Sequence, residues 1–272
     1  MATPDIQRKT AATYGLLWKK ESMHDVPDYW HLHCIEAVVG HSIAKGRCGI
    51  EVGSGCGYDT YHLARANPHL TMLSLVISEG VFATRKITLK FANVRVIQGS
   101  CLSLPVKNES CDFAYSYGVL HHTSDPEKGL REIARVLKRS ALVYLYLYES
   151  HAERPIKYCA VRIIRLARGI TTFMPKRLLY IASMAISPFC YVFFTLPSCF
   201  LARFQLTRKF AQAFPFVFAK GPFSLAGDLY DRLGAPLEYR FSREQVLHLM
   251  QSCGFQNVRI GRIPAVAGWV AW

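Results

Sequence analysis

The stretch GIEVGSGCGYDT, Gly49 to Thr60, decides the fold expected of this chain, because it joins a short apolar run to three closely spaced glycines. Glycine permits positive φ and a close backbone approach, so amide N–H groups and a helix N-terminus can face the polar groups of a ligand. Such a loop between a strand and a helix is typical of cofactor sites. Gly57 comes one residue too early for the dinucleotide pattern G-x-G-x-x-G. A tight turn without a ligand is the less favoured alternative.

Hydrophobic periodicity on both sides of this loop alternates between the two regular structures. It predicts helices and strands in turn from about residue 30 to 148. One of these helices is expected over 125–138, opened by Asp125 and Pro126 at its first turn. After a different middle segment, Ser242 is the expected N-cap of a helix that Gly254 ends, and 256–263 and 265–272 are expected to form two closing strands. Strands that alternate with helices indicate an α/β fold with a doubly wound, mostly parallel sheet.

Length and composition support one α/β domain with an appendage. The chain has 272 residues, of which 51% are hydrophobic, so a sizeable core can be buried. Its nine cysteines are odd in number and never form C-x-x-C, which argues against a disulfide framework and against a metal site. We therefore expect a reducing, cytoplasmic compartment. The first ten residues are polar and lack the apolar region of a secretory signal.

Positive charge is concentrated in one segment. The net charge is +14, and the stretch from His151 to Gly221 holds eleven lysines or arginines against one acid, Glu153. A basic block around an apolar segment favours peripheral contact with an anionic membrane over a nucleic acid. Residues 178–201 carry no formal charge, a length that can span a bilayer, but Pro188 and Pro197 interrupt the run. A buried or lid-like helical insertion, an interfacial element and a true span all remain open.

Several motifs together resemble the class I S-adenosylmethionine-dependent methyltransferases, in particular the type 11 group related to ubiquinone and menaquinone methylases. GIEVGSGCG (49–57) is similar to the first motif of that family, and the segment 96–138 is similar to its adenine-side and strand-four region. KTAATYGLLWKKE (9–21) looks like the tryptophan-containing leader of one subgroup. The resemblance covers about residues 8–148 and the closing LHLMQSCGFQNVRI.

This resemblance implies a Rossmann-like, seven-stranded sheet with a helical insertion between the fifth and sixth strands. It implies a leader and helix over 1–45, a cofactor-binding core over 46–150, an insertion over 151–222 and the rest of the core over 223–272. The glycine loop would cradle the methionine and ribose parts of S-adenosylmethionine, and Glu51 would anchor the loop or the amino group. The residues expected at the cofactor are Glu51, Gly53, Ser54, Gly55, Cys56, Gly57, Ser78, Ser100, Cys101, Leu102 and Ser116.

The sequence departs from the family pattern where acids are expected. Val76 stands where an acid usually binds both ribose hydroxyls, with Glu79 as a substitute that would have to point back, and Ser100 stands where an acid usually receives the adenine amino group. The usual K-P-G-G turn has become KRSA (138–141). A hydrogen bond to a charged group contributes about 1.5–3 kcal/mol, so these losses weaken cofactor binding.

Other side chains carry open alternatives. His121 and His122 follow the fourth strand, where one of them can act as general base or merely bind loop backbone. Tyr14 and Trp18 can cover the cofactor or belong to the core. Asp112 is expected to have a structural role at a strand start.

These observations lead to one main prediction of function. We predict methyl transfer from S-adenosylmethionine to an oxygen or carbon of a small or lipid-like acceptor, in the cytoplasm and peripheral at the inner membrane surface. Because methyl transfer depends mainly on positioning, missing accessory contacts do not exclude it. A catalytically weakened or non-catalytic protein of the same fold is the alternative. A nucleic-acid methyltransferase is less favoured, because strand four lacks the D/N-P-P-Y/F signature.

Overall fold

The computed structural model describes residues 4–21, 31–211, 216, 219–262 and 268–272. The chain forms two compact units: a sheet unit, made of residues 1–150 and 237–272, and a helical unit, His151–Pro236. Parts of the predicted leader, of the insertion and of the last predicted strand lie outside the described residues. The predicted boundaries 1–45, 46–150, 151–222 and 223–272 stay predictions.

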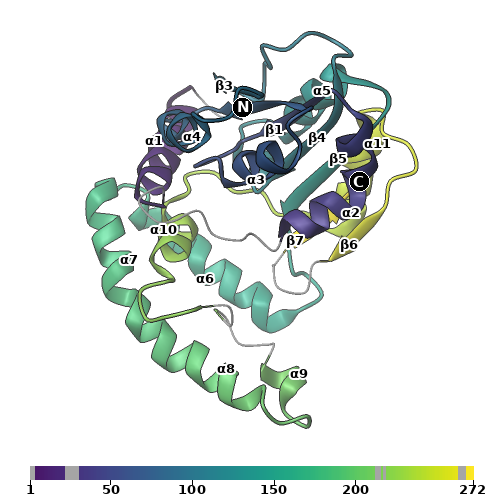
Figure 1. Ribbon diagram of the computed structural model, residues 1–272. Coiled ribbons are helices and arrows are strands. Elements are labelled where there is room, and N and C mark those ends of the chain that lie inside the picture. Colours follow the sequence, from purple (N-terminus) through teal and green to yellow (C-terminus); the bar gives the residue numbers. More distant parts are fainter. Residues whose placement is uncertain (1–3, 22–30, 212–215, 217–218, 263–267) are drawn as a thin grey trace. The chain divides into compact units, whose positions relative to one another are not determined.

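Seven strands form one sheet in the order β3-β2-β1-β4-β5-β7-β6 (Figure 1). The strands are β1 (Cys48–Val52), β2 (Thr71–Val76), β3 (Val94–Gln98), β4 (Cys111–Tyr117), β5 (Leu137–Tyr148), β6 (Ile260–Arg262) and β7 (Gly268–Ala271). The first five run parallel, and β7 lies antiparallel between β5 and β6. The predicted seven-stranded, mostly parallel sheet is confirmed.

Helices cover both faces of this sheet. They are α1 (Pro4–Glu21), α2 (His31–Lys45), α3 (Tyr58–Ala66), α4 (Gly80–Thr88), the 3-10 turn η1 (Leu120–His122), α5 (Pro126–Val136) and α11 (Arg243–Ser252). One apolar core joins Ile50 and Ala114 to α5 and α11, and the other joins Phe113 and Tyr115 to α2 and α3. Neighbouring residues of a strand thus feed opposite cores, as the alternation of side chains along a strand requires.

The junction between α5 and β5 differs from the sequence prediction. Asp125 caps α5 by accepting from Lys128 N at 2.9 Å, and Pro126 follows in the first turn, both as predicted. The helix does not run to Lys138 but ends at Val136, and β5 begins at once. The segment KRSA lies inside β5, where the pairing with β4 shifts register and Ser140 adopts a φ of +60°. An irregularity within the strand therefore takes the place of the expected turn.

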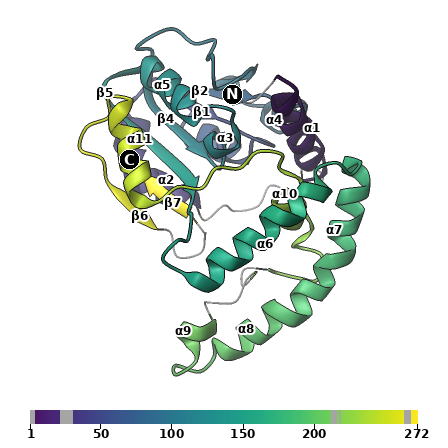
Figure 2. The same ribbon diagram turned by 180° about the vertical axis from the view of Figure 1, so that it is seen from behind.

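The helical unit lies in the sequence between β5 and β6, as predicted. It contains α6 (Pro155–Thr171), α7 (Lys176–Cys190), the π-helical turn η2 (Tyr191–Thr195), α8 (Leu196–Leu201), α9 (Arg208–Ala211) and α10 (Ala226–Gly234). In Figure 2, α7 and α8 belong to one long curved helix, Lys176–Leu201. The prediction that Pro188 and Pro197 interrupt this run is wrong. The π-helical turn precedes Pro197, which occupies the first turn of α8, where its missing N–H costs little.

Candidate functional site

The glycine loop connects β1 to α3 at the carboxyl end of the parallel strands. Gly53, Gly55 and Gly57 have φ values of +91°, +60° and +83°. The N–H groups of Gly53 and Ser54 donate to the carbonyl oxygen of Leu75 on β2, at 2.8 and 3.0 Å. These bonds hold the loop over the edge where ligands bind in doubly wound sheets.

Close neighbours on three sides explain why the loop needs glycine. A Cβ atom at Gly53 would lie 2.2 Å from Val119, one at Gly55 would lie 2.9 Å from the Trp18 ring, and one at Gly57 would lie 2.6 Å from Thr84. The spacing thus serves tight packing in addition to positive φ.

Glu51 lies beneath this loop and is buried. Its carboxyl group accepts a hydrogen bond from the hydroxyl of Thr60 on α3, and that hydroxyl also approaches Ser74 Oγ at 3.0 Å. Burial, followed by the nearby charge of Asp59, raises the pKa of Glu51 to about 8. This side chain fastens the start of α3 to β1, and both of its predicted roles, at the loop and at the cofactor amino group, stay predictions.

Ser54 has the most ligand-directed geometry in the loop. Its side chain is buried, and its hydroxyl has no hydrogen-bond partner among the described residues. Cys56 is also buried and packs with Tyr58 and Ala83. Ser116 Oγ donates to Val52 O at 3.0 Å and ties β4 to the end of β1. A buried hydroxyl without a partner is costly unless a ligand satisfies it.

The remaining predicted cofactor residues follow β2 and β3. Ser78 Oγ accepts from Gly80 N at 3.2 Å. Ser100 Oγ accepts from Leu102 N at 3.2 Å and from Gln7 Nε2 at 3.0 Å. The Cys101 thiol is buried, which raises its pKa to about 12. These hydroxyls therefore hold their own turns in place.

Helix α1 lies along this edge of the sheet unit, a placement that sequence reasoning left open. Its contacts run from Gln7 at Ser100, through Gly15 beside Ser78 and Glu79, to Trp18 at Gly55. Trp18 also packs against the buried cluster of Cys56 and Tyr58, so it is both a core residue and a cover for the loop. Sequence reasoning missed Gln7, because a polar residue on an exposed-looking helix gives no signal of a distant partner.

Val76 and Glu79 stand as the sequence departures predicted. Val76 is buried at the end of β2, where its side chain offers no acceptor. Glu79 is the residue before α4, and its side chain makes no capping bond. Val76 itself thus offers no carboxylate to the ribose, and the substitute role of Glu79 stays a prediction.

His121 and His122 lie in the 3-10 turn after β4, and both are buried. The His122 Nδ1 atom lies 2.8 Å from Leu237 O, and because a carbonyl only accepts, Nδ1–H is the donor of this hydrogen bond. His121 packs on Tyr148 with ring centroids 3.9 Å apart, and neither of its nitrogens has a hydrogen-bond partner among the described residues. Burial, then the positive charges of His122 and Arg240, holds the pKa of His121 well below its usual range.

Tyr14 of α1 contacts His122 at a centroid distance of 5.2 Å, so the histidines and the glycine loop are covered by the same helix. Arg240 lies over the Tyr148 ring at 5.0 Å and pairs with buried Glu238 at 2.7 Å. Sequence reasoning missed Tyr148 and Arg240, which reach the histidines from a strand and from a distant segment.

Two charged groups are structural. Asp112 accepts from the N–H groups of Arg47 and Cys48 and from Lys138 Nζ, at 2.8, 3.0 and 2.7 Å, as its predicted role at a strand start requires. The spacing of Glu132 and Arg135 on one helix face predicts a surface ion pair. The structure shows this pair, and Arg135 also donates to the carbonyl groups of Leu104 and Val106. It holds the loop before β4.

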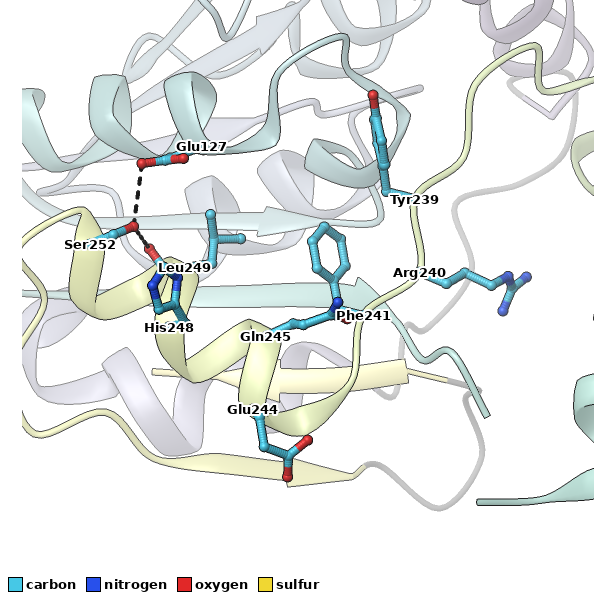
Figure 3. Close-up of a pocket in the computed structure, with 9 residues that line it drawn as sticks. All are labelled: Glu127, Tyr239, Arg240, Phe241, Glu244, Gln245, His248, Leu249 and Ser252. Carbon is cyan, nitrogen blue, oxygen red and sulfur yellow. Dashed lines mark hydrogen bonds between the residues drawn. The ribbon is translucent and has the colours of Figure 1, made fainter. Parts of the chain in front are cut away.

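A separate hollow of the sheet unit lies between α11 and the segment 239–241 (Figure 3). Glu127 and Ser252 meet there at 3.5 Å, and Tyr239, Phe241 and His248 are among the other lining residues. None of the predicted cofactor or catalytic residues lines it. Among the described residues, no group of histidine, cysteine and acidic side chains could hold a metal ion.

The glycine loop fits S-adenosylmethionine in part. Its positive-φ backbone and the unsatisfied Ser54 hydroxyl provide polar groups for the methionine and ribose parts. Ser100, which the family pattern predicts at the adenine side, already accepts a hydrogen bond from Gln7. The missing feature is the acid at Val76. The donor set therefore fits the cofactor with fewer charged contacts than the family pattern supplies.

Comparison with known proteins agrees with this geometry. Residues 50–145 match the family model of the methyltransferase domain. A tRNA (carboxymethyluridine(34)-5-O)-methyltransferase of Saccharomyces cerevisiae is 33% identical over 40% of this chain and 39% of its own length. A chloroplastic 2-methyl-6-phytyl-1,4-hydroquinone methyltransferase 1 of Oryza sativa is 30% identical over 35% of this chain and 29% of its own length. The matches thus span well under half of each relative.

A solved S-adenosylmethionine-dependent methyltransferase of Thermotoga maritima, described as a possible histamine N-methyltransferase, covers 96% of this chain and 97% of its own. It has 16% sequence identity and a TM-score of 0.48. The match of residues 50–145 establishes the class: this chain carries a methyltransferase domain of the class I, S-adenosylmethionine-dependent kind. The cofactor that the sequence predicted, S-adenosylmethionine, is confirmed with it.

Proposed function

We propose that the chain transfers a methyl group from S-adenosylmethionine to an oxygen or carbon atom of a small or lipid-like acceptor. The observation that carries this proposal is that the glycine loop and the histidine pair follow adjacent strands of the sheet unit. A positive-φ glycine loop with an unsatisfied Ser54 hydroxyl ends β1, and a buried histidine pair ends the adjacent strand β4. Donor and acceptor groups can meet at this edge.

The residues that would hold the cofactor are those of the loop and of the turns after β2 and β3. Glu51, Cys56 and Ser116 keep the loop in shape, while Gly53, Ser54, Gly55 and Gly57 face the methionine and ribose parts. Ser78, Ser100, Cys101 and Leu102 flank the adenine side. Bound S-adenosylmethionine supplies an electrophilic methyl group on a sulfonium.

His122 is the stronger candidate for a general base. Its Nδ1–H is fixed by Leu237 O, so Nε2 can accept the proton of a hydroxyl acceptor while the acceptor oxygen bonds to the methyl carbon. His121, held neutral by its lowered pKa, can position the acceptor through a ring nitrogen. Bound S-adenosylmethionine would supply the methyl group by cleavage of its C–S bond, with S-adenosylhomocysteine as the second product.

A phenol-like or hydroquinone-like acceptor suits this site, since Tyr14, Tyr148 and the two histidines provide aromatic faces. The rice relative is by name a hydroquinone methyltransferase, which supports this class of acceptor. Access at a membrane would bring a lipid-like acceptor to the site. We place the chain in the cytoplasm, peripheral at the inner membrane surface, in keeping with eight cysteines that are free in the structure.

RNA methylation is the second candidate, and it rests on one specific observation. The yeast relative is by name a tRNA methyltransferase, and His151–Gly221 is strongly basic. A protein that keeps the fold without catalysis is a third, because Val76 and Ser100 stand where acids are expected.

Calorimetry with S-adenosylmethionine and S-adenosylhomocysteine tests the donor side. Wild type should bind both ligands, and Gly55→Val should not, because a side chain at a φ of +60° would meet Trp18. Gly254→Val is the matched control, because its φ is also positive, at +91°, and an added Cβ there would have no neighbour within 4 Å. No binding by wild type at millimolar ligand would refute the proposal.

The acceptor side needs a second assay. Transfer of labelled methyl to hydroquinones, phenols and lipid extracts should depend on His122, and His122→Ala should lose turnover while it still binds S-adenosylhomocysteine. If RNA were methylated and none of these small or lipid-like acceptors were, RNA methylation would be the function.

A further inference from the structure

The helical unit exposes an unusual number of large apolar side chains. We name the following set the apolar helical surface: Ile163, Leu166, Ile170, Phe173, Ile181, Phe189, Val192, Phe193 and Phe200. Phe173 is 83% exposed and Phe193 is 56% exposed. Exposed apolar side chains in this number favour a site of interaction over ordinary surface.

The buried face of the long helix carries the opposite chemistry. Ser183, Ser187, Thr195 and Ser198 are buried there. Three of these hydroxyls bond to backbone elsewhere in the helical unit: Ser187 to Pro222 O at 2.7 Å, Thr195 to Phe216 O at 2.7 Å and Ser198 to Ala211 O at 3.0 Å. Helices of water-soluble proteins bury an apolar stripe and expose polar groups. Along this helix Leu179 and Cys190 are also buried, but most of its large apolar side chains are exposed, while these four hydroxyl side chains face inward.

Exposed cations accompany the apolar side chains. Arg162 and Arg165 lie directly beside Ile163 and Leu166 on α6, and Arg177 and Arg203 lie near the two ends of the long helix. Within the described ranges, none of these four makes an ion pair. A basic helix with Leu, Ile or Phe on its exposed face is typical of elements that lie in the headgroup region of a membrane.

We propose that the apolar helical surface is a docking surface for an anionic lipid bilayer, which it enters as an interfacial element and does not span. The apolar side chains would insert at the boundary of the acyl chains, and the arginines would reach the phosphates. The inference rests on the peripheral membrane contact of the proposed function and names the surface that makes it.

Spanning is disfavoured by the packing inside the helical unit. Among the described residues, one helix, Lys176–Leu201, is long and apolar enough to cross a bilayer by length and composition. However, α10 packs along α7, with Tyr230 and Tyr180 5.6 Å apart. Helix α10 carries the Asp228–Arg232 ion pair, with 2.6 Å between the charged groups. If the long helix crossed a bilayer, this ion pair would enter the hydrocarbon region.

The charge and the apolar side chains of this surface favour a bilayer over a second copy of the chain and over a nucleic acid. A second copy would bring two strongly basic segments together, each with eleven cations against one acid. A nucleic acid would match the charge, but it would leave Ile163, Leu166 and Ile170 without an apolar partner. Only an anionic lipid surface satisfies both kinds of side chain.

Flotation of the full chain with vesicles tests the proposal. Wild type should float with vesicles that contain about 30% phosphatidylglycerol and should largely remain in solution with pure phosphatidylcholine. Raising the salt from about 0.1 M to about 0.5 M should weaken binding without abolishing it. Phe193→Glu/Phe200→Glu should abolish flotation, and Arg162→Gln/Arg165→Gln should weaken binding about 30-fold.

Matched controls lie on α4 of the sheet unit. Phe82→Glu, at a site that is 64% exposed, and Arg85→Gln/Lys86→Gln, at two exposed cations, should leave flotation unchanged. Binding of S-adenosylhomocysteine by every variant verifies the fold. If the wild type floated but did not bind S-adenosylhomocysteine, the proposed function would be refuted and the docking surface would stand.

Three results would overturn the docking surface. One is failure of the wild type to float, and another is equal flotation of the Phe193→Glu/Phe200→Glu variant. The third is a concentration-dependent dimer or an RNA complex that these substitutions disrupt while lipid binding is absent.

Discussion

In the sheet unit, aromatic side chains such as Phe113, Tyr115 and Tyr144 are fully buried, whereas in the long helix of the helical unit fully buried positions are Ser183 and Ser187. Burial of apolar surface contributes about 25 cal/mol per Å², so the sheet unit gains its stability from within. The long helix keeps much of its apolar surface outside and uses hydroxyl groups to pack inside. The difference teaches that the sheet unit is stabilised by an apolar core, whereas the long helix leaves exposed the apolar side chains that the proposed membrane contact requires.

Truncation of one phenylalanine in each unit tests the contrast between the two units most directly. Phe113→Ala removes a fully buried ring that fills the space beside Gly49, and should lower the free energy of unfolding by about 3–5 kcal/mol. Phe193→Ala in the long helix should change it by less than about 0.5 kcal/mol. Urea denaturation followed by circular dichroism measures both. A large loss for Phe193→Ala would mean that its surface is structural.

A buried acid is the exception within the sheet unit, and it makes the stability of that unit depend on pH. A glutamate in the unfolded chain has an ordinary pKa of 4.5, whereas burial in the folded protein raises the pKa of Glu51 to about 8. Below pH 4.5 the carboxyl is protonated in both states, so its contribution to stability is fully present. As pH rises from about 4.5 to about 8, only the unfolded state releases the proton, and the contribution is lost.

Glu51→Gln should remove this dependence. A tenfold difference in acidity between the folded and unfolded states corresponds to about 1.4 kcal/mol, so the wild type should lose up to a few kcal/mol relative to the variant between about pH 5 and about pH 8. Thermal unfolding across that range measures the difference. Parallel curves for the two proteins would contradict the raised pKa.

Much of the sheet unit could be predicted from sequence, because its elements are set by local signals. The glycine loop, the Asp125-Pro126 helix start and the Ser242 capping box all appear where predicted. The α5–β5 junction could not be predicted, since the early strand start depends on pairing of Leu137 with Cys111, far away in sequence.

Site chemistry was harder to predict for the same reason. The sequence identified the loop and the histidines, but Gln7, Tyr148 and Arg240 reach the site through contacts between distant segments. The helical unit was ambiguous because its local pattern of apolar residues is compatible with a lid, an interfacial helix and a span. Only the buried hydroxyls of the long helix, bonded to backbone 13–35 residues away, distinguish the inward face.

Restoring a family acid would sharpen the ligand-holding role of the sheet unit. Val76→Asp places a carboxylate at the end of β2, where it can accept from both ribose hydroxyls. A charged hydrogen bond contributes about 1.5–3 kcal/mol, so affinity for S-adenosylhomocysteine should rise about 10- to 100-fold.

Val76→Asn is the matched control, because it has the same shape without the charge, and should gain less. Calorimetry measures all three proteins, with thermal unfolding to record the cost of the buried charge. Unchanged affinity in a folded Val76→Asp variant would mean that the ribose lies elsewhere.

The smallest expected effect tests the hydroxyl packing of the helical unit. Ser187 donates to Pro222 O and accepts from Leu225 N at 3.2 Å, so Ser187→Ala leaves both groups without this partner. The expected cost is about 1–2 kcal/mol in the free energy of unfolding. Ile186→Ala, at the neighbouring position that is 42% exposed, removes more atoms and should cost less. Chemical denaturation of the full chain compares the two. If Ile186→Ala were the more destabilising change, the long helix would bury its apolar side after all, and the contrast between the two units would fail.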